Sequence, residues 1–256
     1  SNRRFRAYDT LCVVVVVVLA LLFAFPLYWI ITGSFKSPAE INAADPTWIP
    51  QNWVMRNYEK LMTMRSAPLF EIAVGGYKLV GPRIPAALKW LGNTVFMAVV
   101  SMIITCATAA MAGYALAKKK FYGKTILFGL IICAMALPKQ VILVPLVRLM
   151  SDFELYDTIW AVILPIVGWP FGVFLLKQFS EGIPTEMIEA ARIDGAGELR
   201  TFTDVALPMI KPGIGALAIF TFISAWNDYF MQLIMLTSNE NLTISLGIAT
   251  MQGENS

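Results

Sequence analysis

The chain contains 256 residues, of which 57% are hydrophobic and 14% are charged, and its formal net charge is +3. A soluble domain carries about 25% charged residues, so this composition excludes an ordinary soluble globule and indicates an integral membrane protein. Histidine is absent, which excludes a Ser-His-Asp triad and every histidine-bearing metal site, and the small net charge does not suggest nucleic acid as a partner. Three widely spaced cysteines without a CxxC pair predict neither a disulfide framework nor a zinc site, and we expect them to be small buried hydrophobes: Cys12, Cys106 and Cys133.

Five runs are long and apolar enough to cross a membrane, which takes about 20 mostly apolar residues in a helix. They cover residues 11–32, 91–117, 125–147, 158–176 and 214–236. Pro138 interrupts the third run, and Pro165 and Pro170 lie in the fourth. Because a helix in lipid satisfies its own backbone hydrogen bonds, we expect an all-α membrane protein with five transmembrane helices, organised as a single domain over residues 1–256.

Basic residues gather at alternate ends of these runs. They precede the first run, follow the second and lie in the loop after the fourth: Arg3, Arg4, Arg6, Lys118, Lys119, Lys120, Lys124, Lys177, Arg192, Arg200 and Lys211. The positive-inside rule then predicts a cytoplasmic N-terminus. Residues 33–90 form a long outer loop by this assignment, although it holds seven basic residues, and its residues 57–64 predict a short amphipathic helix on the membrane.

The cytoplasmic loop of residues 180–213 predicts two short helices joined at a glycine bend. Acidic side chains near residue 185 favour the start of a helix over residues 185–193, with Met187, Ile188 and Ala191 on one side. Gly195 is placed to end that helix in the left-handed conformation. A second helix follows, and its apolar positions begin at Leu199.

A pattern at fixed spacing occupies this loop. It reads Glu189-Ala190-Ala191, then three residues, Gly195, nine residues, Val205 and Leu207-Pro208. The pattern resembles the EAA motif of membrane subunits of bacterial ATP-binding-cassette (ABC) importers, with Val205 where isoleucine is usual. Residues 26–36, 135–158 and 222–230 are similar to the second permease of the maltose and oligosaccharide class.

The resemblance implies a type I importer permease fold in which residues 185–193 are the coupling helix that docks on an ATPase. Glu189 is then expected to pair with a basic residue of the ATPase, Ala190 and Ala191 to permit close approach, and Gly195 to allow the bend. The resemblance also places Met187, Ile188 and Asp194 in the region that contacts the ATPase. The family has six spans, so the resemblance also implies that a last span lies beyond residue 256.

The resemblance further implies a multi-pass subunit of the bacterial inner membrane that is not itself an enzyme. Its expected partners are a second permease, two ATPase subunits, an extracytoplasmic binding protein and membrane lipid. This chain is expected to bind no cofactor, since ATP and Mg²⁺ belong to the ATPase. The substrate class implied is an oligosaccharide or related sugar. The alternatives are an importer for another solute and an ion-coupled secondary transporter.

Charged groups inside a membrane span are costly and are functional candidates. Asp228, next to Trp226 and Asn227, lies in the outer half of the fifth run. It either lines a sugar pathway or makes a polar bond between helices. Lys139 either lines a gate or extends to the outer interface. In the second run, small residues recur every fourth position and favour close helix packing: Thr105, Ala109, Gly113 and Ala117.

Overall fold

The computed structural model describes residues 2–74 and 77–253 of the chain. It divides into two compact units, Ser1–Arg65 and Ser66–Ser256, which are described separately. The expected single domain over residues 1–256 stays a prediction.

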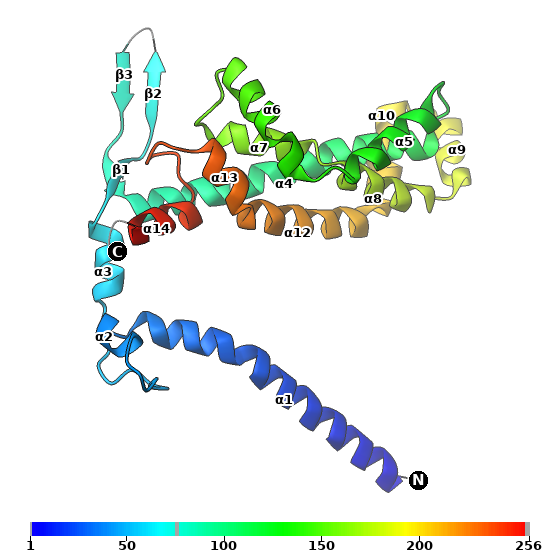
Figure 1. Ribbon diagram of the computed structural model, residues 1–256. Coiled ribbons are helices and arrows are strands. Elements are labelled where there is room, and N and C mark those ends of the chain that lie inside the picture. The colour runs from blue at the N-terminus through cyan, green and yellow to red at the C-terminus, as the bar shows by residue number, and fades with distance from the viewer. Residues whose placement is uncertain (1, 75–76, 254–256) are drawn as a thin grey trace. The chain divides into compact units, whose positions relative to one another are not determined.

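The first unit consists of a long helix and two short ones (Figure 1): α1 (Asn2–Ser34), α2 (Pro38–Ile41) and α3 (Arg56–Thr63). Within Tyr8–Ser34, the most apolar 18-residue stretch of α1 contains no residue that is buried within the chain, as expected of a helix surrounded by lipid or partners. Helix α3 confirms a short helix at the place predicted for residues 57–64, and its position on the membrane stays a prediction.

The second unit contains the remaining helices and four short strands. The helices are α4 (Ala86–Lys118), α5 (Lys124–Met135), α6 (Lys139–Asp152), α7 (Ile159–Val167), α8 (Pro170–Glu181), α9 (Thr185–Ile193), α10 (Glu198–Thr201), the π-helix η1 (Phe202–Ala206), α11 (Leu207–Met209), α12 (Lys211–Asn227), α13 (Tyr229–Met235) and α14 (Ile244–Gly253). Helix α4 packs against α8 and α12. Helices α9 and α10 lie at one end of this unit, and α14 and the strands lie at the other (Figure 1).

The strands form two antiparallel pairs within residues 66–85 that the sequence does not predict. Strand β1 (Ser66–Pro68) pairs with β4 (Arg83–Pro85), and β2 (Glu71–Val74) pairs with β3 (Tyr77–Val80). The chain returns directly into α4, which begins five residues before the predicted start at residue 91. The segment between α1 and α4 therefore covers residues 35–85, which is shorter than the predicted 33–90.

Small residues set the distance between α4 and α8. A Cβ atom added at Gly113 would lie 2.7 Å from the backbone nitrogen of Lys177, and one at Gly172 would lie 3.3 Å from Cβ of Ala109. Both glycines therefore allow the two helices to approach closely, which confirms the packing role predicted for the small residues of the second run.

Three of the predicted spans are broken. Helices α5 and α6 bend by 103° at the break that ends at Pro138, where proline lacks the N–H needed to continue α5. Helices α7 and α8 divide at Gly168 and Trp169, just before Pro170, although together they still form one helical span, Ile159–Glu181. Asp228 separates α12 from α13. The third run, residues 125–147, is therefore not one straight span.

The helical class of the fold is confirmed. Among the described residues, three helices are long and apolar enough to cross a membrane, or up to five if each bent pair forms one span. The expectation for the cysteines is wrong within this chain, because Cys12 and Cys133 are exposed and Cys106 is only half-buried. Apolar runs that face lipid or partners need not be buried by their own chain.

Candidate functional site

The loop at residues 180–213 folds as the sequence predicts. Helix α9 spans Thr185–Ile193, and Gly195 follows it with φ of 79°. The amide of Ala196 donates to the carbonyl of Ala191 (2.9 Å), and that of Gly195 donates to Arg192 (3.0 Å). These two bonds form a Schellman motif, which requires a left-handed residue at Gly195. The sharp turn therefore depends on glycine at this position.

The faces of α9 differ in their environment. Glu189, Ala190, Asp194 and Gly195 are exposed. Ile188 retains only 4% of its exposure and packs in an apolar cluster at the end of the α4–α8 pair. A helix in this position presents its carboxylate and small residues outward while one aliphatic side chain anchors it.

Two expectations for α9 need correction. Met187 is 45% exposed, so it does not share the buried side with Ile188 and Ala191. Ile188, predicted as part of the contact region for an ATPase, is covered by this chain's own cluster instead. The one-residue shift from 187 to 188 rotates a side chain by about 100° around a helix axis, which separates their surroundings.

The second helical run continues through α10, η1 and α11. Phe202 packs against Tyr114 of α4, with ring centroids 5.3 Å apart. Ala206 and Ile210 are buried in the same cluster as Ile188. The apolar side of this run therefore holds the loop of residues 180–213 against α4.

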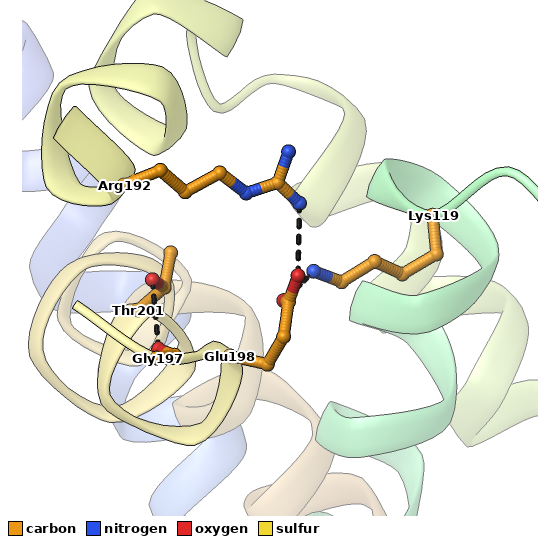
Figure 2. A network of polar contacts seen from close by, with 5 residues as sticks. All are labelled: Lys119, Arg192, Gly197, Glu198 and Thr201. Carbon is orange, nitrogen blue, oxygen red and sulfur yellow. Dashed lines mark hydrogen bonds and ion pairs between the residues drawn. The ribbon is translucent and has the colours of Figure 1, made fainter. Parts of the chain in front are cut away.

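A polar network that sequence reasoning missed joins the loop to α4 (Figure 2). Oε1 of Glu198 accepts from Nη2 of Arg192 (3.1 Å), and Oε2 forms an ion pair with Lys119. Next to it, Lys118 donates to the carbonyls of Glu181 (3.2 Å) and Ile183 (2.6 Å). Partial burial, together with the charge of Arg192, lowers the pKa of Lys119. From the sequence, these basic residues indicate the orientation of the chain in the membrane, but the sequence does not show which groups they contact.

The breaks in the helices surround a cavity of about 280 Å³. Lys139 and Asp228 line it, and their Nζ and Oδ2 atoms are 3.1 Å apart. Asp228 also caps α13, because its Oδ1 accepts from the amide of Met231 (3.3 Å). Lys139 is therefore paired rather than extended alone to an interface. Asp228 both joins two helices and faces the cavity, so the two alternatives for it are not exclusive.

Trp226 and Asn227 are not among the residues that line this cavity. Trp226 packs on Phe222, and the Asn227 side chain donates to the carbonyl of Ile223 (2.9 Å). The cavity wall instead includes Trp169 and Pro170. The prolines near the α7–α8 break were the sequence signal for this wall.

Comparison with known families identifies the chain. Residues 108–255 match the family model described as binding-protein-dependent transport system inner membrane component. The chain belongs to this family. It is thus a permease of a binding-protein-dependent ABC importer, and its family and apolar helices make it a multi-pass inner-membrane protein.

Several relatives of this permease carry transport names. It is 31% identical to the arabinooligosaccharides transport system permease protein AraQ of Halalkalibacterium halodurans, over 91% of this chain and 77% of that protein. It is 30% identical to the diacetylchitobiose uptake system permease protein NgcG of Streptomyces coelicolor, over 97% and 75%. The sn-glycerol-3-phosphate transport system permease protein UgpE of Yersinia pestis is 28% identical, over 98% and 84%.

The fold of the permease also matches a solved structure. That structure is a bacterial ABC transporter involved in the import of the acidic polysaccharide alginate. The match covers 96% of this chain and 80% of the other, with a TM-score of 0.75 and 22% identity. The likeness supports the arrangement of the helices described above.

Proposed function

We propose that this permease forms half of the translocation pathway for an oligosaccharide or related sugar, and that helix α9 couples it to a cytoplasmic ATPase. The observation that carries the coupling role is the exposed face of α9, which ends at the left-handed turn of Gly195. The names of the AraQ and NgcG relatives support a saccharide as substrate. A phosphorylated polyol is the second candidate, supported by the name of UgpE.

Coupling requires that the contacts between α9 and the ATPase differ between the ATP-bound and ATP-free states of the importer. Exposed Glu189 pairs with a basic residue of the ATPase, and Ala190, with the half-buried Ala191, lets the two surfaces approach. Asp194 and Gly195 border this contact region, and Met187 is free to join it. ATP and Mg²⁺ bind to the ATPase, so this chain holds no cofactor and catalyses no reaction.

The complete importer contains this chain, one homologous permease, two ATPases and an extracytoplasmic binding protein. Its N-terminus is cytoplasmic, which follows from the positive-inside rule. Within the second unit, the ion pair between Lys119 and Glu198 brings the basic end of α4 next to the loop of residues 180–213. The uncovered surface of α1 offers contacts for lipid and the second permease.

The substrate pathway passes the cavity lined by Lys139 and Asp228. Their pairing leaves the cavity wall with carboxylate and ammonium groups that can bond to hydroxyls. Trp226 and Asn227 lie just before Asp228 and join the pathway only when α12 and α13 change their relative orientation. Alternating access thus moves the broken helices around this cavity.

The test compares Glu189→Lys with Glu186→Lys in the assembled importer. Both glutamates are exposed on α9, so the second variant controls for a charge change on the same helix. Reversing a carboxylate in an interface is expected to weaken ATPase association more than tenfold and to abolish ATP-driven uptake of radiolabelled arabinotriose into vesicles. Normal association and uptake in Glu189→Lys would sink the coupling role, whereas ATP-driven uptake of glycerol 3-phosphate but not of arabinotriose by the parent importer would favour the second substrate class.

A further inference from the structure

Helix α9 is held to the rest of the chain by few side chains. All nine of its residues are described, and Ile188 is the one that is buried. Ile188 packs near Tyr114 of α4 and Leu176 of α8. A helix held by one side chain can pivot about that contact. A push on its exposed face would then turn α9 without displacing the spans.

Glu198 supplies a second point of attachment (Figure 2). Its carboxylate bonds to Arg192 on the last turn of α9 and to Lys119 just beyond the end of α4. Arg192 is four residues beyond Ile188, which places the two attachments about 6 Å apart along the helix axis. Because the two attachments are separated along α9, they fix the direction of its axis relative to α4. The two helices can therefore move together.

Helix α4 is suited to carry that movement. It has 33 residues, which makes it about 50 Å long, and it packs along α8 and α12. At its other end, Trp90 donates to the carbonyl of Asn239 (2.7 Å) and Asn93 donates to that of Leu242 (2.9 Å). Helix α4 therefore connects the coupling loop with the segment between α13 and α14.

The chemistry of Glu198 fits this role. One carboxylate offers an oxygen to each of two cations, whereas glutamine offers a single acceptor oxygen and no charge. Without the anion, Lys119 and Arg192 would face each other with like charge. The side chains are exposed by 26% for Lys119, 48% for Arg192 and 63% for Glu198. Ion pairs of this exposure contribute little to folding stability, so their removal tests transmission rather than folding.

We propose that Glu198 is a positioning residue that ties α9 to the cytoplasmic end of α4 through Arg192 and Lys119, so that movement imposed by the ATPase reaches the membrane core. The inference rests on the proposed docking of α9 on an ATPase. It assigns a role to a residue outside the contact region for that ATPase.

The first experiment measures whether α9 and α4 move as one body. Spin labels are placed at Ile193 of α9 and Met111 of α4, both exposed, in the assembled importer with its native cysteines replaced. Trapping with Mg-ATP and vanadate is expected to leave this distance unchanged in the parent and to shift it by several ångströms in Glu198→Gln. A shift in the parent, or no shift in the variant, overturns the proposal.

The second experiment measures stimulation of ATP hydrolysis by the binding protein. We expect it to fall about two- to fivefold in Glu198→Gln, the range for an exposed ion pair. Lys119→Gln should give the same loss, and the double variant no further loss, because each change breaks the same connection from α9 through Glu198 to α4. Asp204→Asn is the matched control, since Asp204 pairs with Arg200 four residues away within one helical run. Equal loss in the control overturns the proposal.

ATPase association separates this inference from the proposed function. Glu198→Gln should retain association, because Glu198 acts inside this chain. Loss of association would make Glu198 a direct ATPase contact and overturn the positioning role. If the Glu189→Lys variant associates normally with the ATPase, the proposed docking of α9 is wrong. That outcome is independent of the result for Glu198→Gln.

Discussion

Nζ of Lys139 lies 3.1 Å from Oδ2 of Asp228, which joins the start of α6 to the break between α12 and α13. The Asp228 side chain is 15% exposed and that of Lys139 is 54% exposed. Asp228 is therefore the more enclosed partner, and Lys139 closes over it from the more open side. The ion pair lies on the cavity wall, so opening the cavity must change the contact between Lys139 and Asp228.

Asp228 has two separable tasks, and its variants should separate them. Asp228→Asn keeps an acceptor for the Met231 amide and loses the charge, whereas Asp228→Ala loses both. We expect Asp228→Ala to be less stable than Asp228→Asn by about 1 kcal/mol, the value of a helix N-cap, measured by thermal unfolding in detergent. If both variants assemble poorly with unchanged substrate profile, Asp228 serves packing rather than the pathway.

The backbone conformation at Gly195, and not the space around it, should decide which substitutions this position tolerates. A Cβ atom there has no neighbour within 4 Å, but φ is +79°, where a β-carbon costs about 1–2 kcal/mol. Gly195→Ala should weaken ATPase association in a pull-down assay, and Gly195→Asn should do so less, because asparagine adopts this conformation more readily. Gly197→Ala is the control, since its φ is −67° and no atom lies within 4 Å. Equal effects at both glycines would contradict the backbone explanation.

Gly113 should be intolerant of even one added methyl group. The new Cβ would meet backbone atoms of Leu176 and Lys177 at 2.8 and 2.7 Å, so α4 and α8 must separate, at about 1–3 kcal/mol. Gly92→Ala lies on the same helix with nothing within 4 Å and should be neutral or stabilising because alanine favours helices. Thermal unfolding midpoints of the two variants give the comparison, and equal midpoints would contradict close packing at Gly113.

Asp157 should make the outer loops sensitive to acid. Burial raises its pKa, but hydrogen bonds from the Ser238 hydroxyl and the amides of Ser238 and Thr237 outweigh burial, so the pKa lies below its usual value. Its stabilisation is therefore complete above the unfolded-state pKa of about 3.9 and is lost as pH falls through the lower folded-state value. Asp157→Asn should reduce stability at pH 7 and flatten this acid dependence of thermal unfolding. An unchanged profile in the variant would contradict the assignment.

The local structure of residues 180–213 could be predicted because the sequence signals that specify it come from neighbouring residues. Helix α9 and the left-handed Gly195 follow from residues within one turn of each other. The strand pairs of the outer loop could not be predicted in the same way. Their segments are short, and pairing such as Ala67 with Ile84 depends on contacts across the chain.

The sequence by itself determined the membrane class, the approximate spans and the two short helical segments of residues 180–213, because hydropathy and turn chemistry act over neighbouring residues. Only the tertiary structure decided which charges meet. Lys139 and Asp228 are 89 residues apart, and Lys119 and Glu198 are 79 apart. From the sequence, a charged residue indicates either the free-energy cost of placing a charge in the membrane or the side of the membrane on which it lies. Which residue it pairs with depends on how the helices bend and pack.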